Sequence, residues 1–163
     1  MSHSEVDFIL RKVVPSDALS FVKLLRRENV REFSTPFFDD ATRDRSGQLE
    51  AVGVFFGERM VAIIICELQV WSRRNYSAFE TALTGKVGRR LSQLNLLVVD
   101  KEFRRQGLAS SLLREVTANT YSVFVSYVKD KALEAFLRQR GFKKIGVVKY
   151  EGKKRVALAN YVD

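Results

Sequence analysis

The sequence has few of the residues that build metal sites or covalent active sites. Its 163 residues include one cysteine, Cys66, and one histidine, His3. A single cysteine cannot form an internal disulfide, and these two residues cannot supply the several ligands of a zinc site. Cys66 lies inside the apolar run VAIIICEL, which predicts a buried, inert thiol rather than a nucleophile. Because His3 is close to the N-terminus, covalent hydrolase chemistry of the Ser-His-Asp or Cys-His kind is disfavoured.

Long apolar runs and the features of a signal peptide are also lacking. The longest candidate, MVAIIICELQV, is interrupted by Glu67 and is shorter than the roughly 18 residues of a membrane span. The N-terminal MSHSEVDF has no basic segment followed by an apolar one. Only two prolines and 46% hydrophobic residues argue against disorder. We therefore expect one compact domain over residues 1–163, soluble, cytoplasmic and without a membrane partner.

Acidic residues are scarce in the second half of the chain. Residues 1–71 carry 9 Lys and Arg against 11 Asp and Glu, whereas residues 72–163 carry 19 against 8, giving net charges of −2 and +11. The bases concentrate in an insertion, residues 72–90, and in a tail, residues 138–155. Such a field favours an anionic partner, which could be a phosphate-rich cofactor, a nucleic acid or an acidic protein. The alternative is a solvated face that only aids solubility.

Apolar periodicity and turn residues predict alternating strands and helices. The expected order is a strand over 6–13, a helix over 15–29 capped by Ser16, an irregular loop with one short helix over 31–50, a hairpin around Gly57 and Glu58, the basic insertion, a strand over 91–99, a helix over 108–118, a strand over 121–128, a helix over 130–141 and a hairpin around Gly152. A strand–helix–strand crossover should place strands 91–99 and 121–128 in one sheet, roughly parallel.

The stretch LLVVDKEFRRQGLASSLL joins an apolar strand to a helix through a basic turn with a glycine. The first N–H groups of a helix have no partners within it, so the amides of residues 105–110 could hold a pyrophosphate. Gly107 allows close approach of the backbone, Ala109 keeps the surface low, and Arg104 and Arg105 add positive charge. Neither a P-loop nor a dinucleotide fingerprint occurs, and an ordinary helix start is the alternative interpretation.

These residues resemble the acyl-coenzyme A binding motif of the GNAT N-acetyltransferase superfamily. In that motif a strand ending in V-D is followed by R/Q-x-x-G-x-G/A, matched here by Arg104, Gly107 and Ala109. The downstream DKALEAFLRQRGF resembles the family's second motif, in which a strand leads into Asn, a short helix and a terminal Gly-Phe. The resemblance implies an α+β fold of three-layer α/β/α type. Its sheet is mixed and mostly antiparallel, with a splayed central parallel strand pair and flanking helices.

The resemblance also implies acetyl-coenzyme A as the acyl donor, with no metal. Strands 91–99 and 121–128 would splay apart and place the thioester in the gap, where an amine attacks the carbonyl directly and the departing thiolate is protonated. The backbone of residues 97–99 would pair with the pantetheine arm. The implied donor-binding residues are Leu97, Val98, Val99, Arg104, Arg105, Gln106, Gly107, Leu108, Ala109, Ser110 and Asp130, the last standing where the family has Asn.

Two catalytic positions depart from the family pattern. The tyrosine that serves many members as the acid corresponds to Leu137, which reads more simply as core, and a glutamate of some protein N-terminal acetyltransferases corresponds to Val125. Tyr127, on the strand that lines the expected gap, is the candidate acid, with plain packing on the sheet as the alternative. Glu67 is the candidate base, because a charge in the run IIICELQV must be paired, solvated or shifted in pKa.

The alternative for Glu67 is an exposed strand residue. Gln93 and Asn95 could orient a water molecule but cannot take a proton.

The sequence thus predicts transfer of an acetyl group from acetyl-coenzyme A to a primary amine in a ternary complex. One alternative is a basic module that keeps the fold and binds nucleic acid or protein without chemistry. Another is an acetyltransferase acting on an RNA-borne amine such as an aminoacyl-tRNA. The basic insertion is expected to determine acceptor selectivity and to favour an acidic or RNA-borne acceptor. Its bases include Arg73, Arg74, Arg89 and Arg90. The acceptor's identity and the oligomeric state stay open, with a homodimer among the alternatives.

Overall fold

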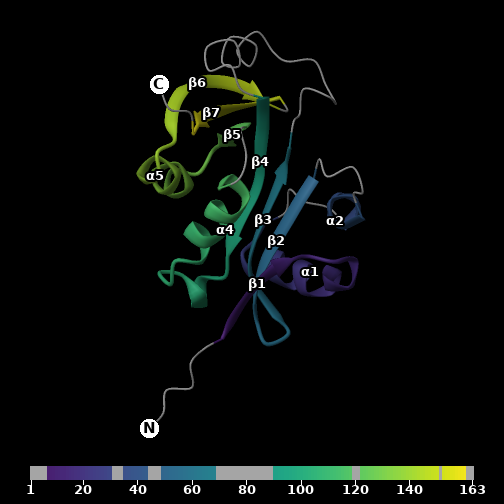
Figure 1. The fold of residues 1–163 in the computed structure, drawn as a ribbon. Helices are drawn as coiled ribbons and strands as arrows, with labels where there is room; N and C mark the ends of the chain where they lie inside the picture. Colours follow the sequence, from purple (N-terminus) through teal and green to yellow (C-terminus); the bar gives the residue numbers. More distant parts are fainter. Residues whose placement is uncertain are drawn as a thin grey trace. The chain divides into compact units, whose positions relative to one another are not determined.

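The computed structural model describes residues 7–30, 35–43, 49–68, 90–118, 122–150 and 152–160 (Figure 1). Its elements are β1 (Phe8–Lys12), the 3-10 turn η1 (Pro15–Asp17), α1 (Ala18–Arg27), α2 (Thr35–Arg43), β2 (Leu49–Phe56), β3 (Arg59–Glu67), β4 (Arg90–Val99), the 3-10 turn η3 (Lys101–Phe103), α4 (Leu108–Thr117), β5 (Ser122–Val128), α5 (Lys131–Gln139), β6 (Lys143–Tyr150) and β7 (Lys153–Ala159). The strands form one seven-stranded sheet in the order β1-β2-β3-β4-β5-β7-β6.

The sheet is mixed, as predicted. The β4 and β5 strands pair in parallel, whereas β1 with β2, β5 with β7, and β6 with β7 pair antiparallel. The crossover through α4 accounts for the parallel pair, because parallel neighbours need a long connection. The predicted fold class, with a central parallel pair and flanking helices, is confirmed.

The start of α1 differs from the prediction that Ser16 caps it. Residues 15–17 form a 3-10 turn, and α1 begins after Asp17. Pro15 suits the first position of such a turn because its φ angle is fixed and it has no N–H to satisfy. The Asp17 carboxylate closes the turn by accepting a hydrogen bond from the Val14 amide at 2.8 Å and from Arg11 at 2.9 and 3.0 Å. Asp17 therefore stands at the N-cap position predicted for Ser16, but its side chain bonds to Val14 and Arg11 and not to an amide of α1.

The chain groups into two compact units, of which the first comprises residues 1–66 and 96–119. In it α1 and α2 pack on one face of the strands, where the rings of Phe21 and Phe38 stack with centroids 4.5 Å apart. In Figure 1 these two helices lie together on one side of β2 and β3, and α4 lies on the other. Because both faces are covered, β2 and β3 are apolar almost throughout.

The second unit comprises residues 67–95 and 120–163. The first residues of β4 pair with β5 from Arg90 opposite Ser122 to Gln93 opposite Val125, and β7 and β6 extend this part of the sheet. Helix α5 contacts β5 and β7 and buries Leu137. The expectation of a single domain stays a prediction. The gap expected between strands 91–99 and 121–128 also stays a prediction. No helix in the described ranges is long and apolar enough to cross a bilayer.

Candidate active site

The β4–α4 loop, residues 100–107, has an unusual backbone conformation. Arg105 and Gly107 both adopt left-handed conformations, with φ angles of 66° and 76°. Left-handed residues alternating with others turn successive N–H groups toward one side, a backbone form that binds anions. Glycine adopts this conformation freely, but for Arg105 it costs on the order of 1 kcal/mol. Strain of this kind is found where the surrounding structure holds a segment for binding or catalysis.

The start of α4 adds amides to this loop. The first hydrogen bond within the helix runs from the Ser111 amide to the Gly107 carbonyl at 3.0 Å. The N–H groups of Leu108 and Ala109 precede it and have no partner within the helix. The Leu108 side chain is buried and fixes the helix to the sheet, whereas residues 104–107 are exposed. The positive end of the helix dipole therefore lies at the surface beside the left-handed turn, an arrangement that fits a pyrophosphate.

Arg104 is engaged elsewhere. Its guanidinium forms an ion pair with Glu28, whose side chain is 5% exposed, and its Nε donates to the Val99 carbonyl at 3.3 Å. The charge of Arg104 is therefore largely neutralised by Glu28. The backbone amides of the loop are better evidence for anion binding than Arg104 is. Arg105 is exposed.

The remaining predicted donor residues have partners that explain their positions. Leu97 and Val99 are half-buried, and between them Val98 points into the core under α1. Asp130 caps α5, because its Oδ1 accepts a hydrogen bond from the Ala132 amide at 2.8 Å. Their contacts with a bound donor stay predictions.

Two tyrosines and a glutamine form a cluster in the second unit. The rings of Tyr127 and Tyr150 stack with centroids 4.4 Å apart and planes 11° from parallel. Nε2 of Gln93, a residue 5% exposed, donates to the Tyr150 hydroxyl at 2.6 Å. Sequence reasoning proposed Tyr127 and missed Tyr150. Tyr150 lies opposite Lys153 and Tyr127 opposite Ala157, so the contact depends on how β7 pairs with both β6 and β5, which residue types do not reveal.

Other candidates fall into clear environments. Leu137 and Val125 are both fully buried, which confirms Leu137 as core. Cys66 is buried, as predicted, and burial raises the pKa of its thiol, which disfavours the reactive thiolate. Glu67 ends β3 and is half-buried, and its role as a base stays a prediction. Asn95 has a buried Oδ1 that accepts no hydrogen bond from the described residues, so this oxygen is an acceptor that a water or ligand could use.

Several sequence candidates lie outside the part of the chain that the structure describes. These are His3, Arg73, Arg74, Arg89 and the side chain of Arg90. In the described part, no three His, Cys, Asp or Glu side chains gather as ligands for a metal ion.

Comparison with known proteins agrees with the geometry of the β4–α4 loop. Residues 76–155 match the model of the family described as Acetyltransferase (GNAT) domain. This match identifies a GNAT domain in the chain. The resemblance inferred from the sequence motifs is therefore confirmed, whereas no curated protein matches the sequence.

Solved structures share the fold of this GNAT domain at low sequence identity. Arabidopsis thaliana NAA60 in complex with a bisubstrate analogue is 14% identical with a TM-score of 0.74, covering 96% of this chain and 100% of that one. The same plant protein in complex with acetyl-CoA is 13% identical with a TM-score of 0.69, covering 94% and 97%. The ribosomal-protein-S18-alanine N-acetyltransferase from Escherichia coli is 13% identical with a TM-score of 0.67, covering 94% and 91%.

Proposed function

We propose that this protein is an acetyl-coenzyme A dependent N-acetyltransferase whose donor binds through the amides of residues 105–110. The observation that carries the proposal is the left-handed turn at Arg105 and Gly107, followed directly by the start of α4. It coincides with the residues that match the GNAT motif, Arg104, Gly107 and Ala109. The complex of NAA60 with acetyl-CoA, a structure of the same fold, supports the choice of donor.

Acetyl-coenzyme A supplies an activated acetyl group, held as a thioester. The nitrogen of a neutral primary amine forms the new bond to the carbonyl carbon, the bond from carbon to sulfur breaks, the amine gives up a proton and the thiolate gains one. In this chain the amides of residues 105–110 compensate the pyrophosphate charge. Glu67 is the proposed base for the amine proton.

The proton for the thiolate is proposed to come from Tyr127 and Tyr150. Leu137 occupies the family tyrosine's place and has no proton to give. The Tyr150 hydroxyl oxygen accepts the Gln93 hydrogen bond, and a hydroxyl that accepts a bond still carries a proton. The parallel stack keeps the two phenol rings in one orientation. In this proposal the two tyrosines supply the acid for the thiolate, which Leu137 cannot do.

The proposed acceptor is a primary amine on an acidic polypeptide. The E. coli structure of the same fold is named for acetylation of an alanine of a ribosomal protein. In the second unit the β6–β7 hairpin exposes only basic charge among its described residues, at Lys143, Lys144, Lys149, Lys153 and Lys154. Lys149 lies directly opposite Lys154, an arrangement that costs stability unless an anion or solvent compensates it.

An RNA-borne amine is the second candidate, since the same lysines attract phosphate. In a third account these lysines do not bind an acceptor. Lysines on an edge strand such as β6 prevent the strand from pairing with other molecules.

Calorimetric titration with acetyl-coenzyme A, followed by an acceptor panel read by thiol release, tests the proposal. The panel contains an acidic peptide, a neutral peptide, a polyamine and an aminoacyl-tRNA. We expect binding of the donor and fastest release with the acidic peptide. Failure of acetyl-coenzyme A to bind at millimolar concentration would refute the proposed function.

A double variant, Lys149→Gln with Lys154→Gln, tests the role of the hairpin. The double variant should bind the acceptor more weakly than wild type at low salt. At high salt the two affinities should be equal, because screening already removes the electrostatic attraction. Lys23→Gln with Arg26→Gln removes the same charge from exposed positions of α1 and serves as the control. Equal behaviour of the two double variants would favour the account in which the lysines only protect the sheet edge.

A further inference from the structure

Asp100, the first residue after β4, is a buried charge with an extensive set of partners. The residue is 1% exposed, and its Oδ2 accepts hydrogen bonds from Arg27 Nε at 2.8 Å and from Arg59 Nη2 at 2.6 Å. Its Oδ1 accepts from the Glu102 amide at 3.0 Å. Burial alone would raise the pKa of Asp100, but the hydrogen bonds from Arg59, the Glu102 amide and Arg27 lower it below its ordinary value. The carboxylate is therefore ionised at neutral pH.

The backbone of Asp100 is fixed as firmly as its side chain. Its N–H donates to the Val61 carbonyl of β3 at 2.8 Å, and its carbonyl accepts from the Phe103 amide at 2.9 Å. Arg27 also donates from Nη2 to the Met60 carbonyl at 2.9 Å. The Asp100 cluster, defined as Arg27, Arg59 and Asp100, thus joins α1, β3 and the end of β4.

A second contact, from the residue directly after α1, holds the residues that follow. Glu28, next to Arg27 in the chain, accepts from the Lys101 amide at 3.1 Å through Oε2 and pairs with Arg104 through Oε1. Residues 100–104 are therefore held at both ends by two consecutive residues, Arg27 at the end of α1 and Glu28 directly after it. The next residue is Arg105, whose left-handed conformation must be imposed by its surroundings.

We propose that Asp100 is a positioning residue, which acts through Arg27 and Arg59 to hold the β4–α4 loop in its anion-binding form. This inference rests on the proposed function, because the loop's ligand is the pyrophosphate of coenzyme A. Asp100 does not touch that ligand in this account. It fixes the direction in which the chain leaves β4, and the direction sets where the amides of residues 105–110 point.

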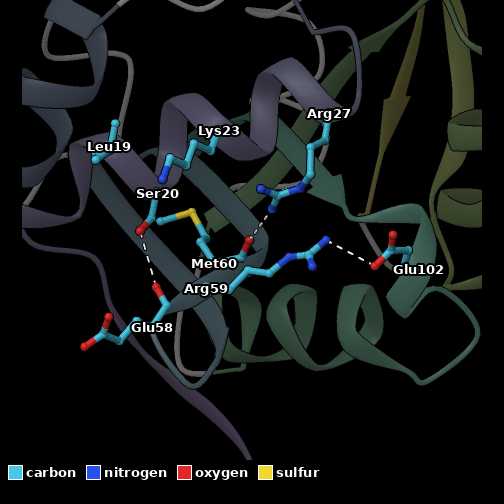
Figure 2. A pocket seen from close by; sticks show the side chains of 8 residues that line it. All are labelled: Leu19, Ser20, Lys23, Arg27, Glu58, Arg59, Met60 and Glu102. Carbon is cyan, nitrogen blue, oxygen red and sulfur yellow. Dashed lines mark hydrogen bonds and ion pairs between the residues drawn. The ribbon is translucent and has the colours of Figure 1, made fainter.

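A pocket beside the cluster determines how a substitution would behave. The pocket has a volume of about 600 Å³. Figure 2 shows Arg27 from α1 and Arg59 from β3 among its lining side chains, with Glu102 at one side. Arg59 also contacts Glu102 at 3.3 Å, and its Nε is buried without a hydrogen-bond partner among the described residues. Water in the pocket can solvate both guanidinium groups when the Asp100 charge is removed. Asp100→Asn should therefore fold, while its loop loses the two charged contacts.

Asp17 offers a matched control in the same unit. Its carboxylate also accepts hydrogen bonds from an arginine, Arg11, and from a backbone amide, that of Val14. The hydrogen bonds to Arg11 also lower its pKa below the ordinary value. It closes the turn before α1, and its hydrogen-bond partners among the described residues, Arg11 and Val14, lie outside the β4–α4 loop. Asp17→Asn therefore removes the same kind of interaction without changing the loop.

The experiment measures the affinity of coenzyme A by calorimetry and the unfolding temperature for wild type, Asp100→Asn and Asp17→Asn. We expect Asp100→Asn to weaken coenzyme A binding by about tenfold or more, because two charged hydrogen bonds are lost, and Asp17→Asn to change it by less than about twofold. In steady-state assays the KM for acetyl-coenzyme A should rise in Asp100→Asn, while kcat and the acceptor KM change much less. A purely structural role would move the unfolding temperature alone.

Arg59→Lys provides a second variant in case Asp100→Asn does not fold. It keeps a positive charge beside Asp100 and removes the fixed geometry of the guanidinium, so an intermediate loss of coenzyme A affinity is expected. If folded Asp100→Asn or Arg59→Lys binds coenzyme A as wild type does, the inference is overturned. If wild type itself does not bind coenzyme A, the proposed function fails instead, and the two results are thereby distinguished.

Discussion

Nε2 of Gln93 lies 2.6 Å from the hydroxyl oxygen of Tyr150, a residue 57 positions later in the chain. This hydrogen bond links β4 with β6, within a cluster whose third member, Tyr127, is stacked on Tyr150. The glutamine amide donates, so the tyrosine hydroxyl acts as acceptor in this contact and can act as donor in another. A hydroxyl held in this way is suited to give its proton to a leaving group.

Removing the two hydroxyls should slow acetyl transfer. Tyr127→Phe and Tyr150→Phe keep both rings and their stack, so the fold should be retained, although Tyr150→Phe removes the acceptor of the Gln93 hydrogen bond and should cost about 1–3 kcal/mol of stability. The double variant is expected to lower kcat by about 100-fold, the lower end of what a positioned acid contributes, with an unchanged KM for acetyl-coenzyme A. Thiol release measured under steady-state conditions checks this. An unaltered kcat in the double variant would mean that the acid lies elsewhere.

A carboxylate introduced in the β4–α4 loop should abolish donor binding. Gly107→Glu places a negative charge beside the proposed pyrophosphate, and repulsion should remove measurable coenzyme A affinity in a calorimetric titration. A Cβ added at Gly107 meets no atom within 4 Å, so the main cost to folding is the left-handed φ of 76°. Gly57→Glu, in an equally open turn with φ of 60°, is the matched control and should bind normally. Equal affinities would move the donor site away from Gly107.

A tyrosine at position 137 should destabilise the protein instead of restoring the family's acid. Leu137 is fully buried on α5, and extra volume in a packed core costs about 1–3 kcal/mol of unfolding free energy. Denaturant unfolding of Leu137→Tyr measures this loss. Leu19→Tyr is the comparison, because Leu19 is exposed on α1 and should tolerate the change within about 0.5 kcal/mol. A gain in kcat with unchanged stability would contradict the account of Leu137 as core.

Glu50 should make stability depend on pH. Burial raises the pKa of this β2 carboxyl, the nearby Lys12 opposes the shift, and Glu115 adds to it. A carboxyl whose pKa is raised in the folded state destabilises the fold when it is ionised, so the destabilising contribution of Glu50 is full at neutral pH and disappears as pH falls through that pKa. Glu50→Gln should therefore raise the melting temperature slightly at about pH 7, and the gain should vanish at about pH 4. A gain that persists at the lower pH would contradict this.

Local patterns in the sequence were sufficient to predict the elements that build this fold. The apolar stripe of helix 108–118 was correct, since Leu108, Leu112, Leu113 and Val116 are all buried in α4. The hairpin around Gly57 was also correct, because a glycine with a left-handed φ connects its strands. These features depend on residues close together in the chain, so periodicity and turn residues reveal them.

Long-range side-chain contacts could not be predicted in the same way. Glu28 and Arg104 are 76 residues apart, and nothing in either segment identifies the other as its partner. Tyr150 meets Tyr127 only because β7 pairs with both strands, with Lys153 opposite Tyr150 and Ala157 opposite Tyr127. The Asp100 cluster joins three segments that are separate in the sequence. The motif could therefore indicate the proposed donor site, whereas the residues proposed to hold or complete it required the three-dimensional structure.

Amide resonances recorded by NMR during titration with coenzyme A test the central claim most directly. If the β4–α4 loop and the start of α4 bind the pyrophosphate, the largest shifts should occur at the N–H groups of residues 105–110, and they should be absent in Gly107→Glu. Desulfo-coenzyme A, which keeps the pyrophosphate, should produce the same pattern. Shifts confined to the basic β6–β7 hairpin, or none at millimolar ligand, would contradict the account.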